Sequence, residues 1–277
     1  MKKVKFAFIA SGGGTDFQAC IDDIQSATGL TKDLIDPVAL FATNKKAGVI
    51  ARAQKAGVPD VVIDFDDLGG LIPFNVRLTG ELVAREIEVL LSVGCKKKVF
   101  PIEGVLMVNI HPAPLKKHGG DGMCNLKPHL SVLAETYDLI NRGRKKIDDD
   151  FFTNIVVHKI NSANGYDNED DEIVLEKEVK IPTAIIAGYF SARLRAEESL
   201  KKLRSSIPVQ NFFGRGLWLS SEFKDVVRTI IEEADNYKKE YDGMLAVAKE
   251  LQQHVLKYEH EILPLAMKAI VEKLRKD

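Results

Sequence analysis

The sequence predicts an α/β protein built on a mainly parallel, twisted sheet with flanking helices. Apolar β-prone runs alternate with segments of helical spacing through the first half of the chain. The run Val105–Val108 is continuously apolar, which is typical of a strand buried on both faces of a parallel sheet. It leads into Asn109, Ile110 and His111, and Pro112 then ends the strand because it cannot donate to a ladder. Since ligands bind beyond the carboxyl ends of such strands, Asn109 and His111 are candidate site residues, with local backbone capping as the alternative.

Composition restricts the class of protein. The chain has 277 residues, enough for one large domain or two small ones, and we expect a single domain over 1–277. The 39 basic and 40 acidic residues give a net charge of −1, so we expect no nucleic-acid or membrane partner. Three widely spaced cysteines predict a reduced, cytoplasmic chain without a metal site. Lys5 interrupts the N-terminal apolar stretch, which we interpret as a first strand and not a signal peptide.

The N-terminal strand, Val4–Ala10, is followed by a glycine loop, Ser11–Asp16, and then by a helical pattern. We expect Thr15 or Asp16 to cap that helix. Glycines let backbone N–H groups approach a ligand and the helix dipole favours negative charge, so the loop is a candidate anion site. A tight turn without a ligand is the alternative. The third glycine of the dinucleotide fingerprint falls on Phe17, which argues against a nicotinamide enzyme.

Further strands and helices alternate up to the central strand. We expect a strand over Asp36–Asn44, a helix over Ala47–Gly57 that Gly57 stops, and a strand over Val61–Asp64. Arg77 comes just before the next helical pattern, and a strand over Leu90–Gly94 leads to three lysines, Lys96, Lys97 and Lys98. A lysine run is usually a solvated loop, but beyond the carboxyl end of a strand it could meet an anionic ligand.

Beyond the central strand, the glycine-rich loop 119–122 is expected where a chain wraps a ligand or a neighbouring backbone. A helix over Leu126–Ile140 and a strand over Phe151–Ile160, which carries His158, precede an acidic loop containing Asp167. The alternating pattern of Glu172–Ile181 predicts a half-buried edge strand. The rest is largely helical, with Pro264 marking a kink or break in the final helix, Gly243–Lys276.

Together these pieces resemble the folate-dependent formyltransferase family, most closely its members that act in purine synthesis. The resemblance implies a Rossmann-like formyltransferase fold, with residues 188–243 as a helical insertion relative to the compact family. The matching stretches are Phe8–Gln18, Ala42–Pro59, Val108–Pro114 with its glycine loop, Val157-His158, Tyr166-Asp167 and Tyr258-Glu259-His260.

By that resemblance, the chain transfers a formyl group from 10-formyltetrahydrofolate, as cosubstrate, to the amine of glycinamide ribonucleotide, with no metal. The implied site residues fall into three groups. The catalytic residues are Asn109, His111 and Asp167; the substrate phosphate-binding residues are Gly13, Gly14, Thr15, Asp16 and Glu259; the folate-binding residues are Arg77, Lys96, Lys97, Lys98, Val99 and Asn109.

The residue types suit this chemistry. An amine attacking a formyl carbon builds negative charge on oxygen, which Asn109 and a protonated His111 could stabilise as hydrogen-bond donors. A carboxylate such as Asp167 would favour the charged form of His111, and the pair could move the amine proton to the folate nitrogen. No metal or covalent intermediate is required.

Four departures from the family pattern affect the expected acceptor. Asp16 replaces an asparagine, Leu256 a lysine and Lys97 an arginine, and the Gly-Pro expected after Asp167 is missing. The alternatives are therefore transfer to another amine, such as an amino sugar nucleotide, hydrolysis of the formylfolate, or a non-catalytic nucleotide-binding scaffold. A homodimer is possible.

Overall fold

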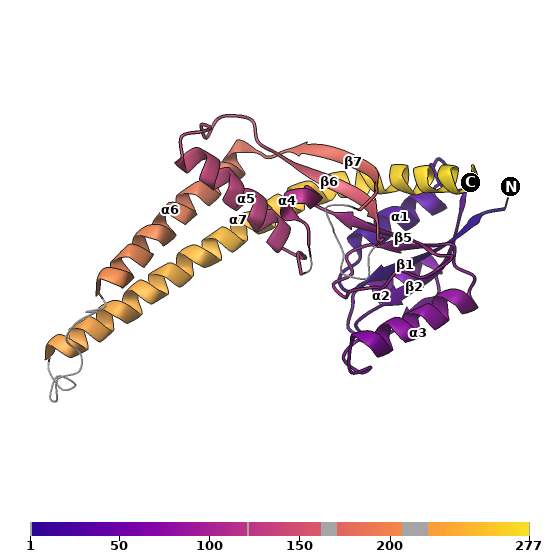
Figure 1. Ribbon diagram of the computed structural model, residues 1–277, viewed down its shortest axis with the longest axis horizontal. Helices are drawn as coiled ribbons and strands as arrows, with labels where there is room; N and C mark the ends of the chain where they lie inside the picture. Colours follow the sequence, from indigo (N-terminus) through magenta and orange to yellow (C-terminus); the bar gives the residue numbers. More distant parts are fainter. Residues whose placement is uncertain (1, 121, 162–170, 207–220, 277) are drawn as a thin grey trace. The chain divides into compact units, whose positions relative to one another are not determined.

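One seven-stranded sheet organises the larger part of the chain (Figure 1). The computed structural model describes residues 2–120, 122–161, 171–206 and 221–276. The chain divides into two units, one made of residues 1–128, 152–179 and 253–277, and the other of residues 129–151 and 180–252. The first unit contains nearly all of the sheet and both predicted ligand-binding stretches.

The sheet has the strand order β3-β2-β1-β4-β5-β6-β7. The pairs from β3 through β5 are parallel, and β6 runs antiparallel to β5. The mainly parallel α/β fold is therefore confirmed, as is the edge position of β7, and the structure pairs the His158 strand with the Asn109 strand. The strands are β1 (Val4–Ala10), β2 (Ile35–Ala42), β3 (Asp60–Val62), β4 (Val89–Ser92), β5 (Leu106–His111), β6 (Phe152–Lys159) and β7 (Ile173–Lys180).

Alternate residues of β1 pack against helices on opposite faces of the sheet. Ala7 and Ile9 belong to a buried cluster with Phe74 and other apolar residues of α3. Phe8 points the other way and meets Phe17 of α1 edge to face, with ring centroids 5.3 Å apart. This period-two alternation between two apolar layers explains why every residue of β1 from Phe6 to Ala10 is apolar.

Two sequence expectations about helices are wrong. Arg77 lies within α3 and not before it, because Leu71 and Phe74 already belong to the apolar face of that helix. Pro264 does not break α7, which continues to Leu274, while a kink at Pro264 stays a prediction; the buried residues around the proline offset its missing hydrogen bond. The helices are α1 (Thr15–Gln25), α2 (Val49–Ala56), α3 (Leu71–Ala84), α4 (Leu115–His118), α5 (Lys127–Asn141), α6 (Thr183–Ser206) and α7 (Ser221–Leu274).

The second unit is helical. Tyr137 of α5 donates a hydrogen bond to Glu197 of α6 over 2.9 Å, and burial together with this carboxylate raises the pKa of Tyr137 to about 12. Helices α6 and α7 pack closely at Gly188. A Cβ added at Gly188 would lie 3.5 Å from Cγ2 of Val247 in α7. The helical insertion over 188–243 stays a prediction. Over the described part of the chain, no helix has the length and hydrophobicity of a membrane span.

Candidate active site

The turn between β1 and α1 requires glycine at position 14. Gly14 occupies the N-cap of α1 with φ 74°, in the left-handed region that favours glycine. A Cβ at this position would lie 2.3 Å from Cγ2 of Val49. The expected cap from Thr15 or Asp16 is wrong, because α1 has no side-chain capping hydrogen bond. The N–H groups of the first helical turn are therefore not used by a cap, which suits an anion site.

Arg52 holds this turn from the neighbouring helix α2. Its Nε donates to the carbonyl of Gly13 over 2.8 Å, and its Nη1 donates to Oε1 of Gln18 over 3.3 Å. The guanidinium therefore brings a permanent positive charge to the glycine turn. Sequence reasoning missed Arg52, because a helical arginine is unremarkable until α2 is known to pack beside α1.

Asp16 meets two α7 residues at the start of α1. Its Oδ1 lies 3.4 Å from Nε2 of His260, an ion pair when the imidazole is protonated. Glu259 is buried, and burial, followed by the charge of Asp16, raises the pKa of Glu259 well above its usual value. A protonated Glu259 adds no charge to the site, and His260 can offset the charge of Asp16. The negative charge of Asp16, which stands where the family has an asparagine, can therefore be balanced by His260.

Asn109 and His111 lie at the carboxyl end of β5 and are both buried. They are two residues apart on one strand, so they face the same side of the sheet. Nε2 of His111 lies 2.9 Å from the carbonyl oxygen of His118, at the end of the short helix α4. Because a carbonyl only accepts, Nε2 of His111 carries a hydrogen in this arrangement. The loop after Pro112 therefore fixes the ring of His111.

A carboxylate that sequence reasoning did not select, Asp171, lies just before β7 and contacts a histidine of the neighbouring strand β6. Oδ2 of Asp171 is 3.1 Å from Nδ1 of His158, and both side chains are almost fully buried. His158 is the direct cross-strand partner of Asn109. Asp167, the predicted catalytic carboxylate, lies outside the described residues. The acidic loop offers several carboxylates in a row, and nothing in its sequence marks Asp171 as the buried one.

The predicted folate-binding segment, Lys96–Val99, follows β4 and is held by its backbone. The N–H of Lys96 donates to Oγ of Ser11 over 2.8 Å. Asn75 of α3 donates to the carbonyl of Lys98 over 3.1 Å and accepts from the N–H of Phe100 over 2.7 Å. Val99 is buried in the core. These contacts fix the path of the segment, in which Lys96 is exposed and Lys97 and Lys98 are partly exposed.

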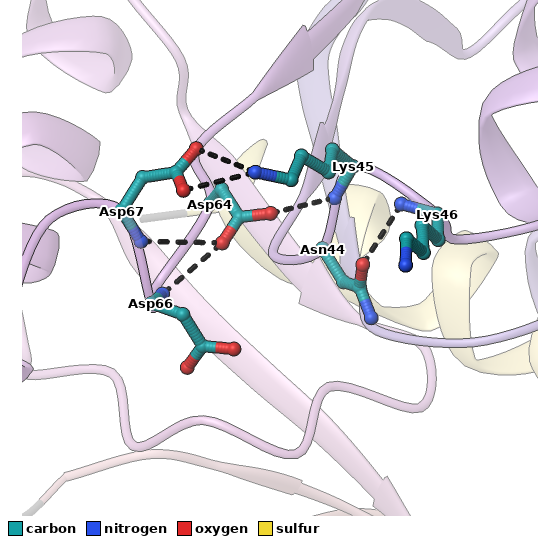
Figure 2. Close-up of polar contacts among 6 residues, drawn as sticks. All are labelled: Asn44, Lys45, Lys46, Asp64, Asp66 and Asp67. Carbon is teal, nitrogen blue, oxygen red and sulfur yellow. Dashed lines mark hydrogen bonds and ion pairs between the residues drawn. The ribbon is translucent and has the colours of Figure 1, made fainter.

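The loops that follow β2 and β3 are tied to each other beside this segment (Figure 2). Asp64 accepts from the N–H of Lys45 over 2.9 Å and from the N–H of Asp66 over 3.1 Å, and the first of these bonds lowers its pKa most. The ammonium of Lys97 lies 3.9 Å from the ring centroid of Phe65 in the same loop. Arg77 is ion-paired with Glu81 within α3.

Comparison with known proteins reveals the relationship. The trifunctional purine biosynthetic protein adenosine-3 of Chironomus tentans is 31% identical over 126 residues, which are 43% of this chain and 9% of that protein. The chloroplastic phosphoribosylglycinamide formyltransferase of Arabidopsis thaliana is 26% identical over 209 residues, covering 71% of this chain and 69% of that one. Glycinamide ribonucleotide transformylase 1 from Symbiobacterium toebii superposes with a TM-score of 0.58 at 16% identity, covering 98% and 89% of the two chains.

The chain has the formyltransferase fold.

The Rossmann-like formyltransferase fold predicted from the sequence is confirmed, and so is the resemblance to phosphoribosylglycinamide formyltransferase. No family model matches the chain. The chain spans 9% of the trifunctional relatives that it matches. Within the residues that the structure describes, no group of three or more His, Cys, Asp or Glu side chains is arranged to bind a metal ion.

The raised pKa of Glu259 predicts a pH-dependent stability. The folded protein keeps a proton on Glu259 that the unfolded chain loses above about pH 4.3. The contribution of Glu259 to the free energy of unfolding is therefore complete below that pH and is lost as pH rises through the folded pKa. Glu259→Gln should therefore unfold like the parent protein near pH 4 and be the more stable protein at pH 8. Urea denaturation at both pH values measures this, with Glu261→Gln on the exposed side of α7 as control. If the difference in free energy of unfolding between Glu259→Gln and the parent protein were the same at both pH values, the prediction would be contradicted.

Asn75 is predicted to fix the folate-binding segment. Asn75→Ala leaves the carbonyl of Lys98 and the N–H of Phe100 without these partners, which should cost about 1–3 kcal/mol of stability. Urea denaturation measures the loss, and Val76→Ala, on the exposed side of the same helix, should change stability far less. Equal effects of the two substitutions would show that Asn75 does not anchor the segment.

Proposed function

We propose that this chain transfers a formyl group from 10-formyltetrahydrofolate to the amine of glycinamide ribonucleotide. One observation carries the proposal: the Gly14 turn and the Asn109–His111 strand end lie at the same edge of one sheet. Strands β1, β4 and β5 are neighbouring and parallel, so their carboxyl ends meet there. Two of the similar proteins are a phosphoribosylglycinamide formyltransferase and a glycinamide ribonucleotide transformylase, whose names denote the same reaction.

Asn109 and His111 would stabilise the charge that develops on the formyl oxygen. Attack by the amine converts the formyl carbon to a tetrahedral centre and places negative charge on that oxygen. Asn109 offers an amide N–H, and both residues are buried, where such interactions are stronger than in water. Because Nε2–H of His111 is bound to the carbonyl of His118, the ring would donate through Nδ1 in its protonated form. One such donor is worth about a hundredfold to a thousandfold in rate.

Proton transfer completes the reaction. The attacking amine loses a proton, and the N10 nitrogen of the folate gains one as its bond to the formyl carbon breaks. We assign this transfer to His111 with Asp167, the carboxylate implied by the family resemblance, and such general acid–base catalysis contributes about 10²–10⁴ in rate. Binding both substrates in one site supplies much of the remaining acceleration.

The ribonucleotide would bind at the glycine turn. The N–H groups of Gly13, Gly14, Thr15 and Asp16 are the expected phosphate donors, and the guanidinium of Arg52 adds positive charge beside them. Burial raises the pKa of Glu259 and so favours its neutral form, in which it would contact the ribonucleotide without repelling its phosphate. This charge balance supports a phosphate-bearing acceptor although Leu256 stands where the family has a lysine.

The folate would bind along Lys96–Val99. Lys96, Lys97 and Lys98, together with Arg77, are the cations expected to meet its anionic glutamate tail, and Val99 and Asn109 the residues nearest its formyl end. No metal is needed for this chemistry. We further expect a cytoplasmic enzyme, monomeric or homodimeric, without nucleic-acid or membrane partners, in which residues 188–243 form an insertion in one formyltransferase domain.

A panel of acceptors tests the proposal. The protein is incubated with 10-formyltetrahydrofolate and either glycinamide ribonucleotide, an amino sugar nucleotide or no amine, and release of the deformylated folate is followed. Release that requires glycinamide ribonucleotide supports the proposal. Release with another amine identifies a different acceptor, release without an amine indicates hydrolysis, and no release at all favours a nucleotide-binding scaffold.

His111 should be essential for rate but not for folding. His111→Ala removes a donor and a proton carrier, so kcat should fall by at least a hundredfold while KM changes little. Steady-state kinetics measures the change, and circular dichroism checks the fold. A variant with near-parental kcat would exclude His111 from the mechanism.

Replacing Arg52 should weaken binding of the acceptor and leave binding of the folate unchanged. Arg52→Gln removes the charge at the glycine turn, so KM for glycinamide ribonucleotide should rise about tenfold, the loss of one modest charge-assisted contact. The KM for the folate and kcat should stay within about twofold. Lys55→Gln, on an exposed position of the same helix, is the matched control. An equal rise of both KM values would contradict a specific role in acceptor binding.

A further inference from the structure

Two lysines lie in loops at the carboxyl edge of the sheet, and their charges are balanced differently. The ammonium of Lys45, after β2, donates to both carboxylate oxygens of Asp67, over 3.0 and 3.2 Å (Figure 2). In the part of the chain that the structure describes, the ammonium of Lys97, after β4, makes no hydrogen bond. It contacts the ring of Phe65, 3.9 Å from the centroid, and the carboxylate of Asp66, also over 3.9 Å. Lys97 therefore keeps its N–H donors for a ligand.

Phe65 is a firm support for the ammonium of Lys97. Its ring meets the ring of Phe74 in α3, with centroids 5.5 Å apart, and packs against the buried cluster beneath the loop. Its N–H donates to the carbonyl oxygen of Thr43 over 3.3 Å. A cation over the face of an aromatic ring is attracted by the negative charge of the π system. A surface lysine loses rotamer freedom when it binds a ligand, so a ring that already holds the ammonium reduces this cost.

Asp66 comes next in the same loop and is the present counter-ion of Lys97. Its carboxylate lies 3.9 Å from the ammonium, and its side chain is 90% exposed. Figure 2 shows that its neighbours are engaged elsewhere: Asp64 accepts backbone N–H groups, and Asp67 accepts from the ammonium of Lys45. No dashed line reaches the carboxylate of Asp66. A long ion pair in water is weak, so the carboxylate of a ligand can displace Asp66 from Lys97.

We propose that Phe65 and Asp66 set how strongly the protein binds the carboxylate tail of its folate. Phe65 is a positioning residue, which holds the ammonium of Lys97 where a ligand carboxylate can reach it. Asp66 competes for the same ammonium, so binding exchanges one carboxylate for another. This role presupposes the proposed function, which places the folate along Lys96–Val99. It adds to that function the loop after β3, to which the family resemblance assigns no residue.

The exchange makes a distinction that a structural role would not make. Tetrahydrofolate ends in a glutamate with two carboxylates, whereas the methylamide of tetrahydropteroate keeps the pterin and benzoyl groups and has no carboxylate. Because Phe65 and Asp66 act only through Lys97, replacing either should change the affinity for tetrahydrofolate and leave that for the methylamide unchanged. Loss of the loop structure would instead change both affinities or neither.

Calorimetric titration of the two ligands under reducing conditions tests the proposal. For tetrahydrofolate, Lys97→Met should raise Kd about tenfold, the loss of one charge-assisted contact. Phe65→Leu should raise Kd about twofold to fivefold, the effect of an exposed cation–π contact, whereas Phe65→Tyr, which keeps the ring, should bind like the parent protein. Asp66→Asn should lower Kd about twofold, because the competing carboxylate is gone. All four variants should bind the methylamide like the parent protein.

Asp36→Asn is the matched control for Asp66→Asn. Asp36 is exposed and lies near the amino end of β2, at the opposite edge of the sheet from the loops. Its replacement makes the same change in net charge and should leave both Kd values unchanged. An equal decrease of Kd in the two variants would show a general effect of charge and overturn competition by Asp66.

Phe65→Leu combined with Lys97→Met separates positioning from packing. If the ring acts through the ammonium, Phe65→Leu should have no further effect on the Kd of tetrahydrofolate once Lys97 is replaced. Multiplying effects would overturn the role assigned to Phe65. Circular dichroism checks that each variant is folded, and if Phe65→Leu is not, the exposed Asp66→Asn substitution decides the proposal on its own.

Tetrahydrofolate carries no formyl group, so its binding is measured independently of turnover. A parent protein that binds it but transfers no formyl group would overturn the proposed function, while the Kd values of the variants would still support or overturn the exchange at Lys97. An active parent protein whose Kd is unchanged by Phe65→Leu and Asp66→Asn overturns the exchange alone. A parent protein that does not bind tetrahydrofolate, or binds the methylamide equally well, also overturns it.

Discussion

The register between β5 and β6 is the constraint on which the site depends. It places His158 opposite Asn109 and brings the buried Asp171 carboxylate to the same region. Because side chains alternate along a strand, a slip of one residue would move His158 to the other face of the sheet. The apolar residues that alternate with these polar ones are buried in the opposite layer, so hydrophobic packing holds the register that the chemistry needs.

The glycine turn shows how much of the site can be predicted locally. Strand β1 has the bounds expected from its apolar run, and Gly14 adopts the left-handed conformation that a glycine turn before a helix requires. Asn109 and His111 stand at a strand end because Pro112 stops the ladder within one residue. These features are set by neighbours in sequence, where propensity and pattern are informative.

The remainder of the site depends on contacts between distant segments. Arg52 reaches the turn only because α2 packs beside α1, and His260 reaches Asp16 from the last helix of the chain. Asp171 is one of several acidic residues in its loop, and only the paired strands distinguish it from the others. Arg77 lies inside α3 because the buried face of that helix already includes Phe74, ahead of the most regular part of its apolar pattern. Pro264 does not end α7 because buried residues flank it on the same helix.

The electrostatics of the site reconcile its unusual residues with an anionic substrate. Arg52 supplies positive charge at the glycine turn, His260 lies within ion-pair distance of Asp16, and burial raises the pKa of Glu259, which favours its neutral form. The most direct test of the account is a single-turnover reaction with 10-formyltetrahydrofolate labelled with carbon-13 in the formyl group and an excess of the protein. The account predicts that the labelled carbon appears on the amine of glycinamide ribonucleotide. Label that remains on the folate, or appears as free formate, would contradict it.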